Sequence, residues 1–304
     1  MFPVLFTIAN IPISSFGLFL AVGFLVGVFL IWRLSRAWDL NEEKILDLTL
    51  LTFLGGLIGA RAYFVLENLS FFSQNLLGII LFNKFPGFSF WGAFLGGWLT
   101  LFYLAKRAKL DFWQLGDIAT IGLLGGLVFS NLGCFLGGCN VGIISDSFLA
   151  VNMVGVLAKR FPVQVLESLL FLFILSSLWS KATRFHQNGK VLSLSLIYIG
   201  AIKLLTGNLK DVQGADTFLS AVLVILGVSI FYTVTRRNLF SDCKEFTEFT
   251  LKLFTDSLTR KRYLESLKKY WYNKKTALWW NLRNLKKNLQ KINVKFSYKN
   301  NKLH

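Results

Sequence analysis

The sequence predicts an all-α integral membrane protein, a seven-transmembrane helix bundle with a basic amphipathic C-terminal helical tail. Hydrophobic residues make up 54% of the 304 residues and charged residues only 16%, more apolar content than a soluble core needs. Apolar runs close to the ~20 residues that cross a bilayer core recur along the chain. Lys and Arg concentrate near the C-terminus, where a membrane protein exposes a soluble segment.

Seven apolar runs are the expected spans, and charged residues or polar turns separate them. The fifth and sixth runs are short, so their ends are the least defined. Another apolar piece, Leu76 to Phe82, is too short to span and is expected at the interface or as a re-entrant segment. The expected spans are Ile13–Trp32, Leu46–Leu66, Phe88–Ala105, Ala119–Leu136, Val163–Trp179, Val191–Thr206 and Phe218–Thr235.

Basic residues in the loops predict the orientation, because Lys and Arg resist translocation. The first, third and fifth loops hold nine of them, the second, fourth and sixth hold four, and the N-terminal segment holds none. We therefore expect the N-terminus outside the cytoplasm and the C-terminus inside. The first residues show neither a basic leader nor a cleavage signal and are expected to be mature sequence.

Two domains are expected, a transmembrane domain over residues 1–235 and a cytoplasmic tail over residues 236–304. The tail holds 18 basic and 5 acidic residues, which is 13 of the net charge of +17. A basic helix beside a bilayer attracts anionic lipid by about 1 kcal/mol per basic residue near the surface. A coiled coil or a solvated helix is the alternative, and no nucleic-acid partner is expected because lipid is the nearer polyanion. An apolar stripe runs through Leu278, Leu282, Leu285, Leu289 and Ile292.

Cysteine and histidine content predicts neither a disulfide framework nor a metal site. Cys134, Cys139 and Cys243 form no CxxC pair, and the chain has only two histidines. Zinc sites need several such ligands from converging segments, so we expect no metal and no cofactor. Cys134 and Cys139 are expected to be small apolar residues in a glycine-rich bend.

Charged residues inside apolar runs are the candidate functional residues, because a charge at the centre of a span costs about 2.5–3.5 kcal/mol on insertion. Arg61 lies among glycines, which favours an interior position over snorkelling to the interface. Lys203 interrupts the sixth run, or snorkels from its end. Glu167, beside Gln164, and Asp117 lie near the start of their runs, where each is either functional or a carboxylate at a helix start.

Five segments, in order across most of residues 10–235, resemble the prolipoprotein diacylglyceryl transferases, bacterial inner-membrane enzymes with seven spans and an outside N-terminus. Each segment is a weak signal alone, and their order and the matching topology carry the resemblance. Glycines in these segments also predict closely packed helices. The segments are IPISSFGLFLAVGF, LGGLIGARAYFVLE, GFSFWGAFLGG, SNLGCFLGGCNVG and FPVQVLESLL.

The resemblance implies transfer of a diacylglyceryl group from phosphatidylglycerol to the cysteine thiol of a lipobox preprotein. Phosphatidylglycerol or another anionic phospholipid and the preprotein are then the partners, in a multi-pass protein of the bacterial cytoplasmic (inner) membrane. Under this reading Arg61 and Lys203 hold the phosphate, Glu167 assists proton removal, and Asn131 contacts the headgroup. The expected lipid-binding residues are Asn131, Arg61, Lys203, Ser89, Gln164, Gly133, Gly138 and Gly142.

This sequence departs from the family pattern at several polar positions, which keeps a second function open. That alternative is a non-catalytic relative that binds anionic lipid or a membrane partner, and a transporter is a more distant possibility because no paired repeats are visible. The departures are Phe16 for tyrosine, Trp91 for histidine, Asn131 and Lys203 for arginine, Cys134 for asparagine, and Cys139 and Gly207 for glutamate.

Overall fold

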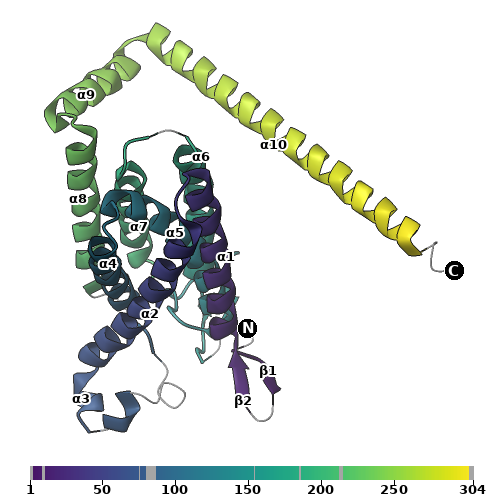
Figure 1. The fold of residues 1–304 in the computed structure, drawn as a ribbon. Helices are drawn as coiled ribbons and strands as arrows, with labels where there is room; N and C mark the ends of the chain where they lie inside the picture. The colour runs from purple at the N-terminus through teal and green to yellow at the C-terminus, as the bar shows by residue number, and fades with distance from the viewer. Residues whose placement is uncertain are drawn as a thin grey trace. The chain divides into compact units, whose positions relative to one another are not determined.

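The computed structural model describes residues 3–8, 11–74, 76–79, 87–153, 155–184, 186–211 and 215–300. The chain divides into two compact units, Met1–Arg236 and Arg237–His304. Each unit is mainly helical, and the first contains the long apolar helices (Figure 1).

Six helices of the first unit are long and apolar enough to cross a membrane. Seven spans were predicted, and the third of them coincides with α4 (Phe90–Arg107), which is not among the six. Its 18 residues end in Lys106 and Arg107, which lower its mean hydropathy. The six are α1 (Ser15–Ala37), α2 (Glu42–Glu67), α5 (Phe112–Gly137), α6 (Val163–Ala182), α7 (Lys190–Gly207) and α8 (Ala215–Thr235).

Short elements that the sequence did not predict lie in the connections. Strands β1 (Val4–Ile8) and β2 (Ile11–Ser14) form an antiparallel hairpin before α1. Strands β3 (Val151–Asn152) and β4 (Lys159–Arg160) pair in the α5–α6 connection. Between α2 and α4 lie α3 (Leu69–Phe72) and the 3₁₀ turn η1 (Leu76–Ile79). That turn is the start of the predicted interfacial segment, whose remainder lies outside the described residues.

Polar side chains begin several of the helices. The hydroxyl of Ser14 accepts a hydrogen bond from Gly17 N–H, and Asn41 Oδ1 accepts one from Lys44 N–H. Both contacts satisfy N–H groups that have no partner inside the helix. Helix α5 ends at Gly138, whose φ of 80° is a left-handed conformation that glycine adopts without strain.

Glycines bring two helix pairs into close contact, as the sequence predicted. A Cβ atom on Gly27 of α1 would lie 2.9 Å from the carbonyl oxygen of Gly122 in α5. A Cβ atom on Gly59 of α2 would lie 2.5 Å from the carbonyl oxygen of Gly92 in α4. Backbones that approach this closely gain van der Waals contact in lipid, where no hydrophobic effect drives helices together.

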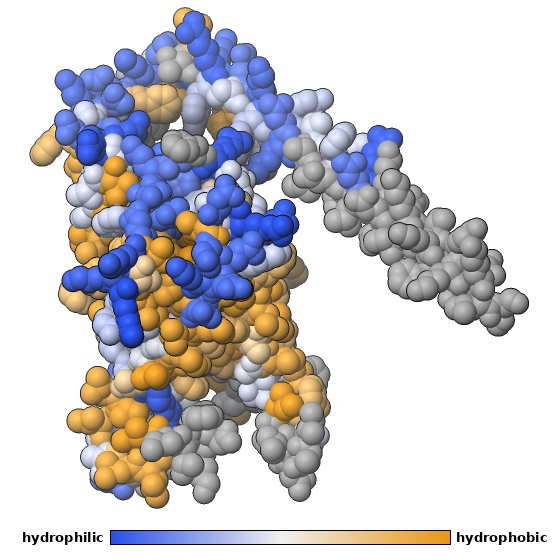
Figure 2. Space-filling model, viewed as in Figure 1, coloured by the Kyte–Doolittle hydropathy of each residue, from blue (hydrophilic) through white to orange (hydrophobic). Residues whose placement is uncertain are grey.

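Helix α5 forms the centre of the first unit, where it packs against α1, α4, α6 and α7. Its Ile121 and Leu124 are completely buried. Many large hydrophobic side chains are exposed on the outer surface of the bundle, and they form a broad orange zone in Figure 2. An apolar outside around a packed inside is the arrangement expected of helices that face lipid.

The second unit contains α9 (Leu239–Thr255) and α10 (Ser257–Asn300). The rings of Phe249 and Tyr263 pack edge to face between them, with centroids 5.6 Å apart. Trp271, Trp279 and Trp280 of α10 are exposed. The side chains of the predicted apolar stripe lie outside the described residues.

Candidate active site

One end of the bundle gathers most of the residues that the sequence singled out. The starts of α4, α6 and α8 and the ends of α2, α5 and α7 lie at this end, together with the β1–β2 hairpin (Figure 1). Backbone hydrogen bonds join these segments, from Ser89 N–H to Ala60 O and from Ile143 N–H to Leu209 O. We call it the hairpin end of the bundle.

The carboxylate of Glu167 is the centre of a charged cluster at the hairpin end. Its Oε2 accepts a hydrogen bond from Lys203 Nζ at 2.8 Å, and its Oε1 lies 2.9 Å from Lys210 Nζ. The hydroxyl of Thr206 donates to Oε1 at 2.7 Å. Glu167 is only 1% exposed, so two ammonium groups and a hydroxyl compensate its charge inside the bundle. We call these four residues the Glu167 cluster.

Lys203 also lies against two aromatic rings. Its ammonium nitrogen is 4.8 Å from the ring centroid of Phe90, at the start of α4, and 5.9 Å from that of Phe171 in α6. The face of an aromatic ring attracts a cation. These contacts place the ammonium group between α4, α6 and α7.

Trp91 occupies the position that the resemblance assigns to a histidine. It is buried, and its indole Nε1 donates a hydrogen bond to Asp216 Oδ1 at 2.7 Å. An indole N–H can only donate, so Trp91 cannot take part in proton transfer as an imidazole would. In this chain Trp91 links the starts of α4 and α8.

Arg61 lies near the end of α2 and contacts the connection that leads to α4. Its Nε, Nη1 and Nη2 donate to the carbonyl oxygens of Ile79, Gly87 and Gly78, at 3.0, 3.0 and 2.6 Å. That Arg61 and Lys203 hold one phosphate together stays a prediction. Arg61 holds the α2–α4 connection beside Ser89, whose N–H bonds to Ala60 O.

The predicted headgroup contacts Asn131 and Gln164 are both buried. Asn131 Nδ2 donates to Leu127 O, one turn back in its own helix, at 2.9 Å. Gln164 Nε2 donates to the carbonyl oxygens of Cys139 and Asn140, at 2.6 and 2.9 Å. Gln164 therefore ties the first turn of α6 to the segment that follows α5.

Cys134 and Cys139 form a disulfide, which corrects the prediction that they are small apolar residues and that the cysteines form no disulfide framework. The left-handed turn at Gly138 reverses the chain after α5, so the two Cα atoms lie 5.0 Å apart. Their separation of five residues across a helix end is not a recognised pairing motif, and a helix continued to residue 139 would not bring them together.

The predicted site glycines have packing roles in the structure. A side chain on Gly142 would collide with the carbonyl group of Phe161, and one on Gly133 would lie 2.6 Å from Phe19 Cβ. Gly138 provides the turn after α5. These glycines let the loop and α1 approach the site end of α5, and their contact with lipid stays a prediction.

Sequence reasoning missed Lys210 and Arg160 as site residues because both lie in connections between the long helices. Arg160 Nη1 forms an ion pair with Asp211 Oδ2 at 2.9 Å and donates to Gly142 O at 3.1 Å. Lys210 pairs in a backbone bridge with Gly142. Helical spacing does not mark Lys210, because α7 ends at Gly207, three residues before it.

A second polar cluster lies at the opposite end of the bundle. The buried carboxylate of Asp117 accepts hydrogen bonds from Gly189 N–H at 2.8 Å and Leu192 N–H at 2.6 Å, at the start of α7. His186 Nε2 lies 3.2 Å from the same carboxylate, and this hydrogen bond is the main cause that raises the pKa of His186. Asp117 therefore binds the start of another helix.

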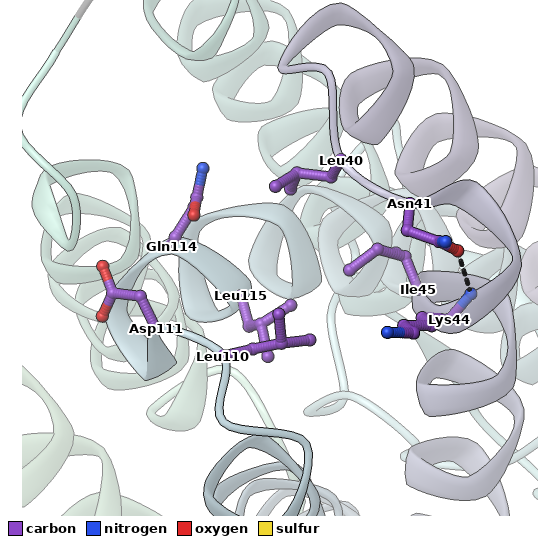
Figure 3. Close-up of a pocket in the computed structure, with 8 residues that line it drawn as sticks. All are labelled: Leu40, Asn41, Lys44, Ile45, Leu110, Asp111, Gln114 and Leu115. Atoms are coloured by element: carbon purple, nitrogen blue, oxygen red, sulfur yellow. Dashed lines mark hydrogen bonds between the residues drawn. The ribbon is translucent and has the colours of Figure 1, made fainter.

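A small pocket also lies away from the hairpin end, between the α1–α2 turn and the start of α5 (Figure 3). Four of its lining residues are leucine or isoleucine. Asn41 uses its side-chain oxygen to cap α2, as the dashed line shows. The lining residues are Leu40, Asn41, Lys44, Ile45, Leu110, Asp111, Gln114 and Leu115.

The Glu167 cluster combines a carboxylate that can accept a proton with ammonium groups that can bind a phosphate. Arg160 and Asp211 add one more cation and one more carboxylate beside it. Asp216, which bonds to Trp91 next to Phe90, is a third carboxylate close to Lys203, so three cations face three carboxylates here. The ammonium groups favour an anionic ligand as charged hydrogen-bond donors, without a net positive charge.

Comparison with known proteins identifies the family. A protein from Clostridium tetani (strain Massachusetts / E88) named phosphatidylglycerol–prolipoprotein diacylglyceryl transferase is 25% identical over 248 residues, 76% of this chain and 97% of the relative. A relative of the same name from Finegoldia magna is 25% identical over 248 residues, 79% of this chain and 99% of the relative. One from Rhodopirellula baltica is 31% identical over 159 residues, 50% of this chain but only 30% of the relative.

A family model described as prolipoprotein diacylglyceryl transferase matches residues 3–233, which include every helix of the first unit except the last residues of α8. The match therefore contains the Glu167 cluster, Arg61 and the disulfide. The chain belongs to the prolipoprotein diacylglyceryl transferase family.

Proposed function

We propose that this protein transfers the diacylglyceryl group of phosphatidylglycerol to the cysteine thiol of a lipobox preprotein. The observation that carries the proposal is the Glu167 cluster, a carboxylate with two ammonium groups buried at one end of a membrane bundle. Charged groups are expensive in this environment, and their usual role is to bind a substrate or move a proton.

The reaction forms a carbon–sulfur bond and breaks a carbon–oxygen bond. The sulfur attacks the glyceryl carbon that carries the phosphate, and glycerol phosphate leaves with the electron pair of the broken bond. A free thiol with a pKa of about 8.5 is mostly protonated at neutral pH, so the proton must be removed. Glu167 takes that proton, while Lys203 and Lys210 stabilise the negative charge of the departing phosphate.

The remaining predicted residues act around this centre. Arg61 attracts the phosphate through space, because hydrogen bonds to carbonyl oxygens leave a guanidinium charged. Asn131, Gln164 and Ser89 contact the headgroup, and Gly133, Gly138 and Gly142 let the backbone approach it. No step requires a metal or a cofactor.

We propose α4 as a seventh span. It packs along α2 through glycines on both helices, so it occupies the same depth as an apolar helix of sufficient length. Seven spans place the two termini on opposite sides of a bacterial inner membrane. The distribution of Lys and Arg then puts the N-terminus outside and the C-terminus in the cytoplasm.

The domain division proposed from this topology is a transferase domain over residues 1–235 and a cytoplasmic tail over residues 236–304. The tail carries 18 basic and 5 acidic residues, and exposed tryptophans lie along α10. Tryptophan favours the headgroup region, and basic residues favour anionic lipid. We propose that the tail binds the anionic inner leaflet.

A transfer assay tests the proposed function. The protein is purified in detergent and supplied with phosphatidylglycerol and a lipobox peptide, and mass spectrometry detects a thioether-linked diacylglyceryl peptide. A peptide with serine in place of the cysteine is the matched control. Product above the control supports transfer. Retention of phosphatidylglycerol without product supports instead the non-catalytic lipid-binding relative.

A further inference from the structure

The Cys134–Cys139 disulfide lies directly beside a residue of the proposed site. Cys134 is in the last turn of α5, and Cys139 follows the left-handed residue Gly138. Cys139 N–H also donates to Cys134 O at 3.0 Å. The covalent bond therefore closes a short loop and fixes the direction in which the carbonyl group of Cys139 points.

That carbonyl group is one of the two acceptors of Gln164. Both amide hydrogens of Gln164 are used, one on Cys139 O and one on Asn140 O. A flipped amide would bring its oxygen against two carbonyl oxygens, so the hydrogen-bond pattern defines the orientation of the amide group. The loop closed by the disulfide thus sets where the amide oxygen points.

The oxygen of this amide is buried without a hydrogen-bond partner in the described part of the chain. Gln164 is 1% exposed and lies three residues before Glu167, on the same face of α6. Buried acceptors nearly always accept a hydrogen bond, so we expect a donor from a bound molecule next to Gln164 Oε1.

We propose that Cys134 and Cys139 are positioning residues whose disulfide aims Gln164 Oε1 at a substrate donor. This inference rests on the proposed function and deepens it. The donor is an O–H or S–H group, and two substrates carry one, the headgroup hydroxyl of phosphatidylglycerol and the thiol of the preprotein cysteine. A disulfide is stable in an oxidising compartment, which agrees with a hairpin end that faces away from the cytoplasm.

The first part of the test asks whether the disulfide exists in the membrane. Membranes that contain the full chain are treated with N-ethylmaleimide under denaturing conditions, with or without prior dithiothreitol. The dithiol gives two electrons and two protons to the cysteine pair and becomes a cyclic disulfide. We expect Cys243 to react in both samples and Cys134 and Cys139 to react only after reduction. Labelling of all three cysteines without reductant overturns the proposal.

The second part is a double-mutant cycle in the transfer assay. It compares the wild type, Gln164→Ala, Cys134→Ser with Cys139→Ser, and the triple variant, with Cys243→Ser as the matched control. Each of the first two changes should lower kcat/KM by about three- to tenfold, the effect of one hydrogen bond. The triple variant should lose no more than either alone, because both changes remove the same contact. Losses that multiply overturn the proposal.

The Michaelis constants identify the donor. A KM that rises for phosphatidylglycerol alone assigns the donor to the headgroup hydroxyl, and a KM that rises for the peptide alone assigns it to the thiol. If both KM values stay unchanged, neither bound substrate donates to Gln164 Oε1, and the proposal is overturned. If Gln164→Ala does not fold, Gln164→Met keeps the side-chain volume and replaces it.

A readout without turnover separates this inference from the proposed function. The same four proteins are unfolded thermally in detergent. Non-additive shifts of the unfolding midpoint show that the disulfide acts through Gln164, whether or not the chain transfers lipid. Additive shifts contradict the link between the disulfide and Gln164. Absence of product in every protein, with non-additive shifts, refutes the transferase function alone.

Discussion

At the residue scale, two of the charges that the sequence marked as candidates, Glu167 and Lys203, prove to be partners of one another. Glu167 and Lys203 stand out in a sequence because they interrupt apolar runs, and that signal needs no structure. Glu167 lies in α6 and Lys203 in α7, so their pairing depends on how these two helices pack. The residue pattern within a single helix does not predict that packing. Lys210 joins them from a loop, where a basic residue is unremarkable in sequence.

Replacing Glu167 with glutamine should damage both stability and transfer. Without the carboxylate, the ammonium groups of Lys203 and Lys210 remain side by side in a buried place, which should lower the free energy of unfolding by about 3–5 kcal/mol. Loss of the proton acceptor should also lower kcat by about 100-fold or more. Thermal unfolding and the transfer assay measure the two effects. Glu43→Gln, an exposed carboxylate at the start of α2, is the control and should change neither.

The hydrogen bond between His186 and Asp117 makes a pH-dependent contribution to stability. His186 Nδ1 lies 2.8 Å from Arg184 O and Nε2 lies 3.2 Å from Asp117 Oδ2. Both ring nitrogens therefore face acceptors, which the doubly protonated imidazolium satisfies. The hydrogen bond to Asp117 raises the pKa of His186 above its ordinary value, and burial opposes the rise.

This hydrogen bond stabilises the folded state more at low pH than at high pH, because the pKa of His186 is raised in the folded state. The stabilisation is complete below the ordinary pKa of about 6.5 and is lost as the pH rises through the folded-state pKa of His186. Thermal unfolding of the wild type and His186→Gln between pH 5.5 and 9 measures it. The unfolding midpoint of the wild type should exceed that of the variant by the largest amount at the acidic end. A difference in midpoint that grows with pH would refute this assignment.

At the scale of elements, the sequence predicted the long helices well and the short ones poorly. Runs of about 20 apolar residues have few alternatives in a membrane protein, so the helices were expected where they lie. The β1–β2 hairpin was missed because Val4–Ile8 and Ile11–Ser14 are short apolar runs whose pattern does not distinguish a strand from the start of a span. The Cys134–Cys139 disulfide was missed because its geometry depends on the turn at Gly138.

The contact between α2 and α4 should be sensitive to a single methyl group. In Gly59→Ala the new Cβ would lie 2.5 Å from the carbonyl oxygen of Gly92, and backbone atoms cannot move aside cheaply. We expect the free energy of unfolding to fall by about 1–3 kcal/mol, as in other overpacked contacts. Gly126→Ala is the matched control, since its new Cβ would meet nothing closer than 3.8 Å. Equal unfolding midpoints for the two variants would contradict close packing of α2 on α4.

At the scale of the whole molecule, the polar groups of the first unit gather at its two ends and apolar side chains cover its outside. Asp117 and His186 join helices at one end, whereas the Glu167 cluster, Arg61 and the disulfide lie at the other. Loop charges in the sequence predict which end faces the cytoplasm, because the charge bias acts during insertion.

Reporter fusions test this orientation. A fusion at Asn238, just after α8, should report the cytoplasm, and a fusion at Ser147, in the α5–α6 connection, should report the opposite side. A cytoplasmic report from both positions would mean that the bundle has a different number of spans, and the proposed location of the site would then be wrong.

The binding of phosphatidylglycerol at the Glu167 cluster is the central claim, and photo-crosslinking tests it most directly. Purified full-length protein is mixed with phosphatidylglycerol that carries a photoreactive group on its headgroup, irradiated and mapped by mass spectrometry. We predict labels in the first turn of α6 and between Lys203 and Lys210, and their loss when excess unmodified phosphatidylglycerol competes. Labels confined to the outer faces of the helices, unchanged by the competitor, would contradict the account.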